Sequence, residues 1–285
     1  MVLATFVLVA TGPSYAEPLG STSIPTSLAD DEKRLMPKVM TEFYGSFDKQ
    51  KACWISTKSG PQPEAAPYMW GVDKGNTVNV DITYCMKPTR LDVIKSNGRK
   101  MLFVVAGGNF LDEDGRPQAS DPAPGILGLI VLTPNGANLG LVGTNDLYEG
   151  YMNYGGYPEH DTVTVHKLGP NGRYGWVAKL GYAHSNREYE WVQLYGLIGN
   201  SVKLLTAFVT DYSGDNFDRT NLSVNYAFET HSSASSFYPI VLRVSGIREG
   251  RPFRSNYRLV FDDMSRKYLT PKNMPEEIES AASTR

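Results

Sequence analysis

Three short turn sequences constrain the fold more than any other feature of the chain. Ser96-Asn97-Gly98, Pro134-Asn135-Gly136 and Pro170-Asn171-Gly172 each separate two runs that are rich in apolar and β-branched residues. An Asn-Gly pair accepts positive φ at low cost, so each sequence is typical of a tight turn between antiparallel strands. The turns therefore predict a protein built largely from hairpins.

Apolar runs with a period of two continue this pattern as far as residue 261. We expect about twelve strands in a mainly β fold, an antiparallel β-sandwich or stacked sheets, with the β domain covering residues 51–270. A β-propeller is the alternative, because the turn sequence at 132–136 recurs at 168–172 and such recurrence is typical of propeller blades.

The first 16 residues are typical of a secretory signal peptide. An apolar run from Val2 to Ala10 is followed by Gly12 and Pro13, and small residues then predict cleavage after Ala16. The run is too short for a membrane anchor, which needs roughly 20 apolar residues. No basic residue precedes it, which is consistent with a start codon further upstream. We expect an exported protein, periplasmic or extracellular.

One amphipathic helix is predicted within the segment 17–50. Ser27 and Asp30 resemble a helix start, because their side chains can accept hydrogen bonds from the first free amides. Pro37 predicts that the helix either begins or kinks there. The apolar stripe comprises Leu35, Met36, Val39, Met40, Phe43, Tyr44 and Phe47.

The chain has two cysteines, Cys53 and Cys85, and both lie in strand-like sequences. Paired cysteines in an exported protein most often form a disulfide. A redox pair would normally be closer in sequence, as in Cys-x-x-Cys. We expect a structural disulfide between them.

Charge and hydropathy restrict the partners. The formal net charge is −2 and acidic and basic residues are interspersed, so we expect no nucleic-acid partner, which would need a basic face. No later apolar run is long enough to cross a bilayer, and we expect no membrane span in the mature chain.

The segment 144–161 is the strongest candidate for a binding surface. It places Tyr148, Tyr151, Tyr154 and Tyr157 at every third residue, among several glycines. This spacing brings the rings to one side of a polyproline-like backbone, and tyrosine is favoured at protein-binding surfaces. A second long loop, at 106–125, is expected to contribute. The alternative is that the rings fold back and plug the edge of the sandwich.

Catalytic candidates lie in the same segment. Glu149 and Glu159 could flank a glycosidic bond, with His160 beside them, but no nucleophile motif such as Gly-x-Ser-x-Gly occurs. His160 and His166 begin and end an alternating run that is typical of a half-buried strand, and they are too far apart to share one metal ion.

We expect no cofactor, and the alternative is a calcium site. Asp211, Ser213, Asp215 and Asp218 supply oxygen donors at spacings related to a cation loop. The glycine of this segment precedes Asp215 and no glutamate closes it, so a solvated turn between two strands is the favoured interpretation.

Export, a β scaffold and aromatic loops together favour a binding protein. We expect an envelope protein that recognises a protein partner, of the inhibitor or toxin-neutralising type. The alternatives are an envelope hydrolase acting on a glycan or ester, and a subunit of an envelope assembly. Residues 271–285 are expected to form a flexible tail.

Overall fold

The computed structural model describes residues 18–61, 79–96, 98–112, 114–116, 124–145, 150–154, 161–184, 187–214, 219–232 and 234–279. The expected signal peptide lies outside these residues. Within them, no helix combines the length and apolar character needed to cross a membrane.

The described residues are mainly β, as expected, with one α-helix, α1 (Glu32–Tyr44), and two short 3₁₀ helices, η1 (Thr26–Leu28) and η2 (Pro170–Gly172). The strands are β1 (Gly20–Pro25), β2 (Ser46–Asp48), β3 (Cys53–Pro61), β4 (Asn79–Ser96), β5 (Arg99–Phe110), β6 (Pro124–Asn135), β7 (Asn138–Thr144), β8 (Gly150–Tyr154), β9 (Val163–Gly169), β10 (Arg173–His184), β11 (Arg187–Ile198), β12 (Ser201–Ser213), β13 (Asn221–Phe228), β14 (Ile240–Arg248), β15 (Arg251–Asp262) and β16 (Lys267–Leu269).

All three predicted hairpins are present. β4 and β5 close at Ser96 and Arg99, β6 and β7 close at Asn135 and Asn138, and η2 connects β9 to β10. The backbone is left-handed at the second turn, where Gly136 has a φ of 65°, and at the third, where Asn171 has a φ of 59°. The turn residues thus supply the conformation for which their types are suited.

The sixteen strands outnumber the twelve expected. β4 merges two runs that looked separate in the sequence, whereas β1, β2, β8 and β16 are too short to show a clear period. The strands form two antiparallel groups, β1 to β8 and β9 to β16, which join where Ser201 of β12 pairs in parallel with Thr144 of β7. This continuous order differs from the separate blades of a propeller.

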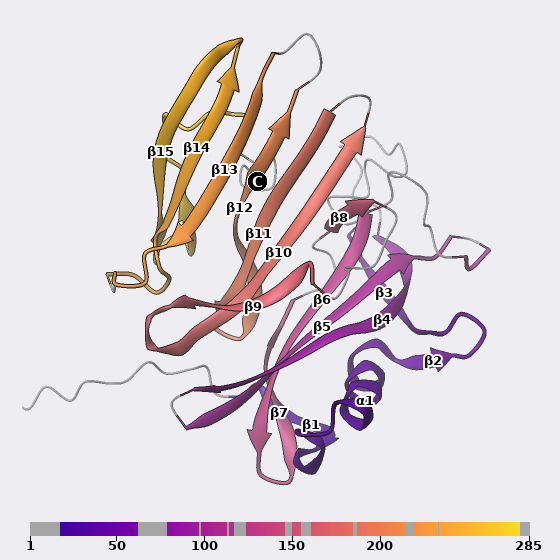
Figure 1. Ribbon diagram of the computed structural model, residues 1–285. Helices are drawn as coiled ribbons and strands as arrows, with labels where there is room; N and C mark the ends of the chain where they lie inside the picture. Colours follow the sequence, from indigo (N-terminus) through magenta and orange to yellow (C-terminus); the bar gives the residue numbers. More distant parts are fainter. Residues whose placement is uncertain are drawn as a thin grey trace, which may run out of the picture.

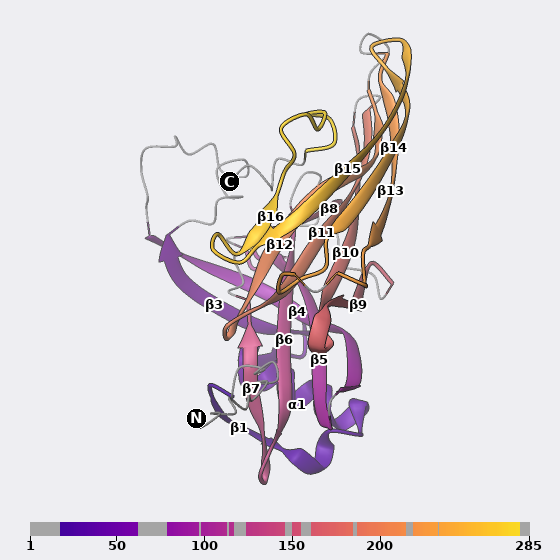
Figure 2. The ribbon, with the colours of Figure 1, turned by 90° about the vertical axis from the view of Figure 1, so that its left-hand side faces the viewer.

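The groups stack as layers around three apolar clusters (Figures 1 and 2). Helix α1 covers one face of β4 to β6, where Val104 is buried. The other face of β5 and β6 packs against β10 to β12, with Phe103 against Trp176. The opposite face of β10 to β12, including Val177, packs against β13 to β16. The molecule is therefore a stack of sheets, as expected from its sequence.

Helix α1 begins at Glu32, between its two predicted starts at Ser27–Asp30 and at Pro37. Asp31 is the N-cap, and its Oδ1 accepts a hydrogen bond from the Arg34 amide at 3.2 Å. The helix continues through Pro37, whose carbonyl accepts a hydrogen bond from the Thr41 hydroxyl at 2.9 Å. Phe47, expected on the helical stripe, lies instead in β2 and is exposed.

The disulfide between Cys53 and Cys85 is confirmed, and both cysteines are fully buried. It joins β3 to β4, and the chain contains no further cysteine. A buried disulfide is typical of proteins from oxidising compartments.

The segment expected to be a flexible tail contains buried residues. Met274 and Ile278 belong to the cluster between β12 and β14 to β16. The Ile278 carbonyl accepts a hydrogen bond from the Val209 amide at 2.9 Å. The chain therefore packs against β12 as far as residue 279.

Candidate functional site

The two predicted contact loops meet at one end of the first sheet. Gly125 pairs with Tyr151 and Pro124 pairs with Tyr154, so β8 extends the sheet beside the start of β6. Both predicted loops are shorter than expected, because residues 106–110 are the buried end of β5 and residues 150–154 are a strand. Ladder hydrogen bonding, rather than a polyproline conformation, fixes the backbone at the centre of the tyrosine segment.

The other candidates from this segment lie outside the described residues. These are Tyr148, Tyr157, Glu149, Glu159 and His160, so their roles remain predictions. For Tyr151 and Tyr154 the structure describes the backbone alone.

A tight turn follows β5 at the beginning of the first of these loops. The Asp112 carboxylate accepts a hydrogen bond from the Arg116 amide at 2.7 Å, and the Gly115 amide donates to the Asp112 carbonyl. The Leu111 amide donates to Thr83 of β4. The loop thus leaves the sheet in a defined direction.

His166 lies on the polar face of β9, as the alternating pattern predicted, while Val163 and Val165 pack into the core. Its Nε2 is 2.9 Å from the Thr164 hydroxyl. Burial of the ring, followed by the charges of Lys179 and Arg90, lowers the pKa of His166. The imidazole is consequently neutral at neutral pH.

The predicted cation loop is described only in part. Asp211 lies in β12 and pairs with Glu190 of β11 and Ser223 of β13, while Asp215 and Asp218 lie outside the described residues. Among the residues whose placement is described, no three carboxylates, histidines or cysteines gather as metal ligands would.

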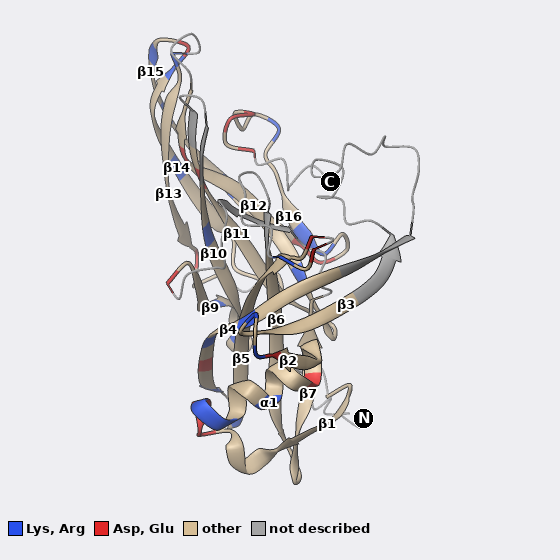
Figure 3. Ribbon diagram, turned by 90° about the vertical axis from the view of Figure 1, so that its right-hand side faces the viewer, with Lys and Arg blue, Asp and Glu red and all other residues tan. Residues whose placement is uncertain are grey.

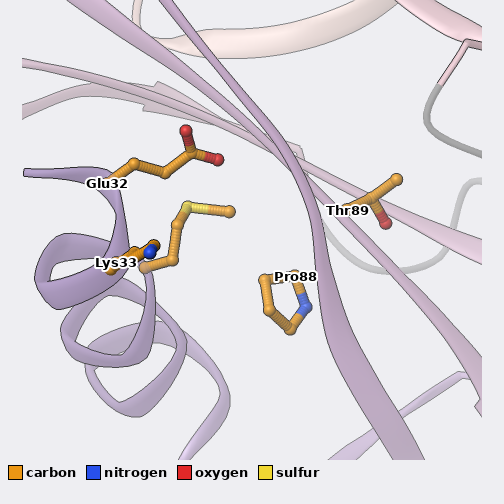
Figure 4. Close-up of a pocket in the computed structure, with 5 residues that line it drawn as sticks. Glu32, Lys33, Pro88 and Thr89 are labelled. Atoms are coloured by element: carbon orange, nitrogen blue, oxygen red, sulfur yellow. The ribbon is translucent and has the colours of Figure 1, made fainter.

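The surface of the described structure includes two hollows of similar volume. The first, of about 380 Å³, separates the first turn of α1 from β4 and is lined by Glu32, Lys33, Met36, Pro88 and Thr89. In Figure 4 the Glu32 carboxylate points toward β4, whereas Thr89 lies on the far side of that strand. These side chains do not converge on one point, so the hollow has no evident ligand chemistry.

The second hollow, of about 330 Å³, lies on the outer face of β13 to β15. Sequence analysis did not identify it. Five of its six lining residues are polar or charged, and the set consists of Asn225, Arg243, Val244, Ser245, Arg254 and Asn256. The available signal was the alternation of Arg with apolar residues in β14 and β15, which places each Arg on the face opposite the core.

Comparisons with protein-family models, with curated protein sequences and with solved structures found no match to this chain.

Proposed function

We propose that this protein is an exported binding protein that recognises a protein partner through the paired loops, residues 111–123 and 144–161. The observation that supports this proposal is the pairing of β6 with β8. It brings together two segments that were identified separately as contact loops, at one end of a buried sheet.

The physical argument concerns rigidity. Binding is strengthened when contact residues are held before the partner arrives, because less conformational entropy is lost. The β8 backbone is fixed against β6, and β6 is buried from Ile126 to Leu132. Tyrosines adjoining such an anchor offer a large contact area at a low entropic cost.

An inhibitor or toxin-neutralising protein is the concrete form of the proposal. Such proteins present loops from a stable scaffold, and the buried disulfide between Cys53 and Cys85 is consistent with an oxidising envelope compartment.

The test uses the mature chain, residues 17–285, first to capture a partner from envelope extract and then to titrate the purified partner by calorimetry. Tyr148→Ser with Tyr157→Ser is the informative variant, because both residues flank β8 (Gly150–Tyr154) in the sequence. We expect at least a tenfold loss of affinity, in line with the cost of removing aromatic anchors.

The matched control is Met264→Ser with Leu269→Ser, which removes exposed apolar side chains from the β15–β16 hairpin. Its affinity should remain that of the native protein. Equal affinities for all three proteins would refute the binding assignment. Turnover of a glycan or ester that disappears in Glu159→Gln would support the hydrolase instead.

A further inference from the structure

The outer face of β13 to β15 is a surface separate from the paired loops, and it carries polar and basic side chains. Alternate residues of these strands point into the core, as do Leu222, Leu242 and Leu259, and the residues between them are exposed. The described chain places no helix or second sheet over this outer face (Figures 1 and 2). In the described structure, strands β13 to β15 therefore have one face packed in the core and one face open to solvent.

Strand register gathers hydrogen-bond donors in the middle of this face. Arg243 of β14 lies directly between Asn225 of β13 and Asn256 of β15. Arg254 of β15 lies opposite Ser245 of β14 and is the diagonal neighbour of Arg243. Diagonal neighbours have Cβ atoms about 7–8 Å apart, within reach of two long side chains that bind one group.

The charges of these two arginines are not compensated locally. In the described structure neither Arg243 nor Arg254 forms an ion pair, whereas Arg258 pairs with Glu229 at 2.7 Å. The nearest acidic residue along the paired strands, Asp211, lies two strands from β14 and is in register with Ser245. It is therefore about 12 Å from Arg243, for strands spaced about 4.8 Å apart and a rise of about 3.3 Å per residue. That distance exceeds the Debye length of about 8–10 Å, so its attraction is largely screened.

The surrounding sequence is also basic. Residues 219–267 contain eight Lys and Arg but four Asp and Glu, although the whole chain has a formal charge of −2. Figure 3 shows basic residues recurring along β14 and β15. Two adjacent guanidinium groups repel each other, and a bound dianion would relieve that repulsion.

We infer that the hollow between Arg243 and Arg254 binds a phosphoryl group. Two guanidinium forks match a doubly charged tetrahedral oxyanion in charge and in donor number. The carboxamides of Asn225 and Asn256 and the Ser245 hydroxyl can complete the shell of donors. A volume of about 330 Å³ leaves room for the group to which the phosphoryl is attached.

Free phosphate and a phosphomonoester headgroup in a membrane share this chemistry, so the test uses both. Inorganic phosphate is titrated into the mature chain by calorimetry at constant ionic strength. Cosedimentation is measured with phosphatidylcholine vesicles that contain or lack phosphatidic acid. Arg243→Gln with Arg254→Gln removes both charges and keeps polar side chains of similar reach.

Arg251→Gln with Lys267→Gln is the control, since it removes the same charge from exposed positions outside the hollow. We expect binding of at least one probe, with at least a tenfold loss in the Arg243/Arg254 variant and less than a twofold loss in the control. Binding of phosphate alone would indicate a small ligand, and binding of vesicles alone a lipid headgroup. The inference fails if neither probe binds, or if both variants lose binding equally. The outcome of this experiment does not depend on whether the paired loops bind a protein partner.

Discussion

Strands β5 and β14 differ in how many of their faces are covered by other elements. β5 is buried from Met101 to Phe110, because α1 covers one of its faces and β10 to β12 cover the other. β14 is covered on one face, so buried and exposed residues alternate along it from Leu242 to Ser245. A strand with two covered faces must be apolar on both, whereas a strand with one free face can carry polar groups at little cost in stability.

The largest expected effect comes from removing a large buried side chain from the covered sheet. Phe103→Ala removes a fully buried ring that packs edge-on against Trp176 at 5.1 Å. We expect a loss of about 3–5 kcal/mol in the free energy of unfolding. Ser223→Ala, on the free face of β13, should change it by less than about 0.5 kcal/mol. Urea denaturation compares the two, and similar losses would remove the distinction between the regions.

A smaller effect tests how closely α1 packs on the same sheet. A Cβ at Gly128 of β6 would lie 2.0 Å from the Tyr44 hydroxyl oxygen. Gly128→Ala should therefore cost about 1–3 kcal/mol through overpacking. Gly181→Ala is the control, since a Cβ there meets no atom closer than 4.0 Å.

Tyr44→Phe should restore part of the stability of Gly128→Ala, because it removes the oxygen that clashes. Thermal unfolding of the single and double variants measures this recovery. A double variant no more stable than Gly128→Ala would show that the Tyr44 hydroxyl does not limit the space beside β6.

The smallest effect concerns His166, at the boundary between the two groups of strands. Its pKa is lowered in the folded protein from the usual 6.5, so below that pH the unfolded chain binds more protons than the folded one. Stability should therefore be complete above about pH 7.5 and decline as the pH falls through 6.5 toward the folded pKa. His166→Gln should show a smaller decline in the urea midpoint between pH 7.5 and 5.5, and an unchanged decline would contradict this role.

Much of the fold could be predicted because its signals are local. The Asn-Gly turns identified three hairpins, since the conformation of a turn depends on the residues within it. The disulfide followed from two cysteines in one chain. The order of the layers could not be predicted, because the burial of Val104 and Phe103 on opposite faces of β5 depends on elements distant in sequence.

The surface sites were harder to predict from the sequence than the core was. The tyrosine segment appeared to be one loop because the partner of β8 lies beyond an intervening hairpin, at Gly125. The arginine hollow was missed because net charge is averaged over the whole chain. Arg243 and Arg254 become neighbours only through the register of β14 and β15.

The covered sheets hold the fold, and we propose that the free face of β13 to β15 binds a ligand. The most direct test is the urea unfolding of native protein and of Arg243→Gln with Arg254→Gln, each with and without phosphate at constant ionic strength. Without phosphate, we predict that the variant is at least as stable as the native protein. With phosphate at 100 times its Kd, we predict stabilisation of the native protein alone, by about 2.7 kcal/mol. Equal stabilisation of both proteins, or a large loss of stability in the variant without phosphate, would contradict phosphate binding between Arg243 and Arg254 on a face that the fold does not need.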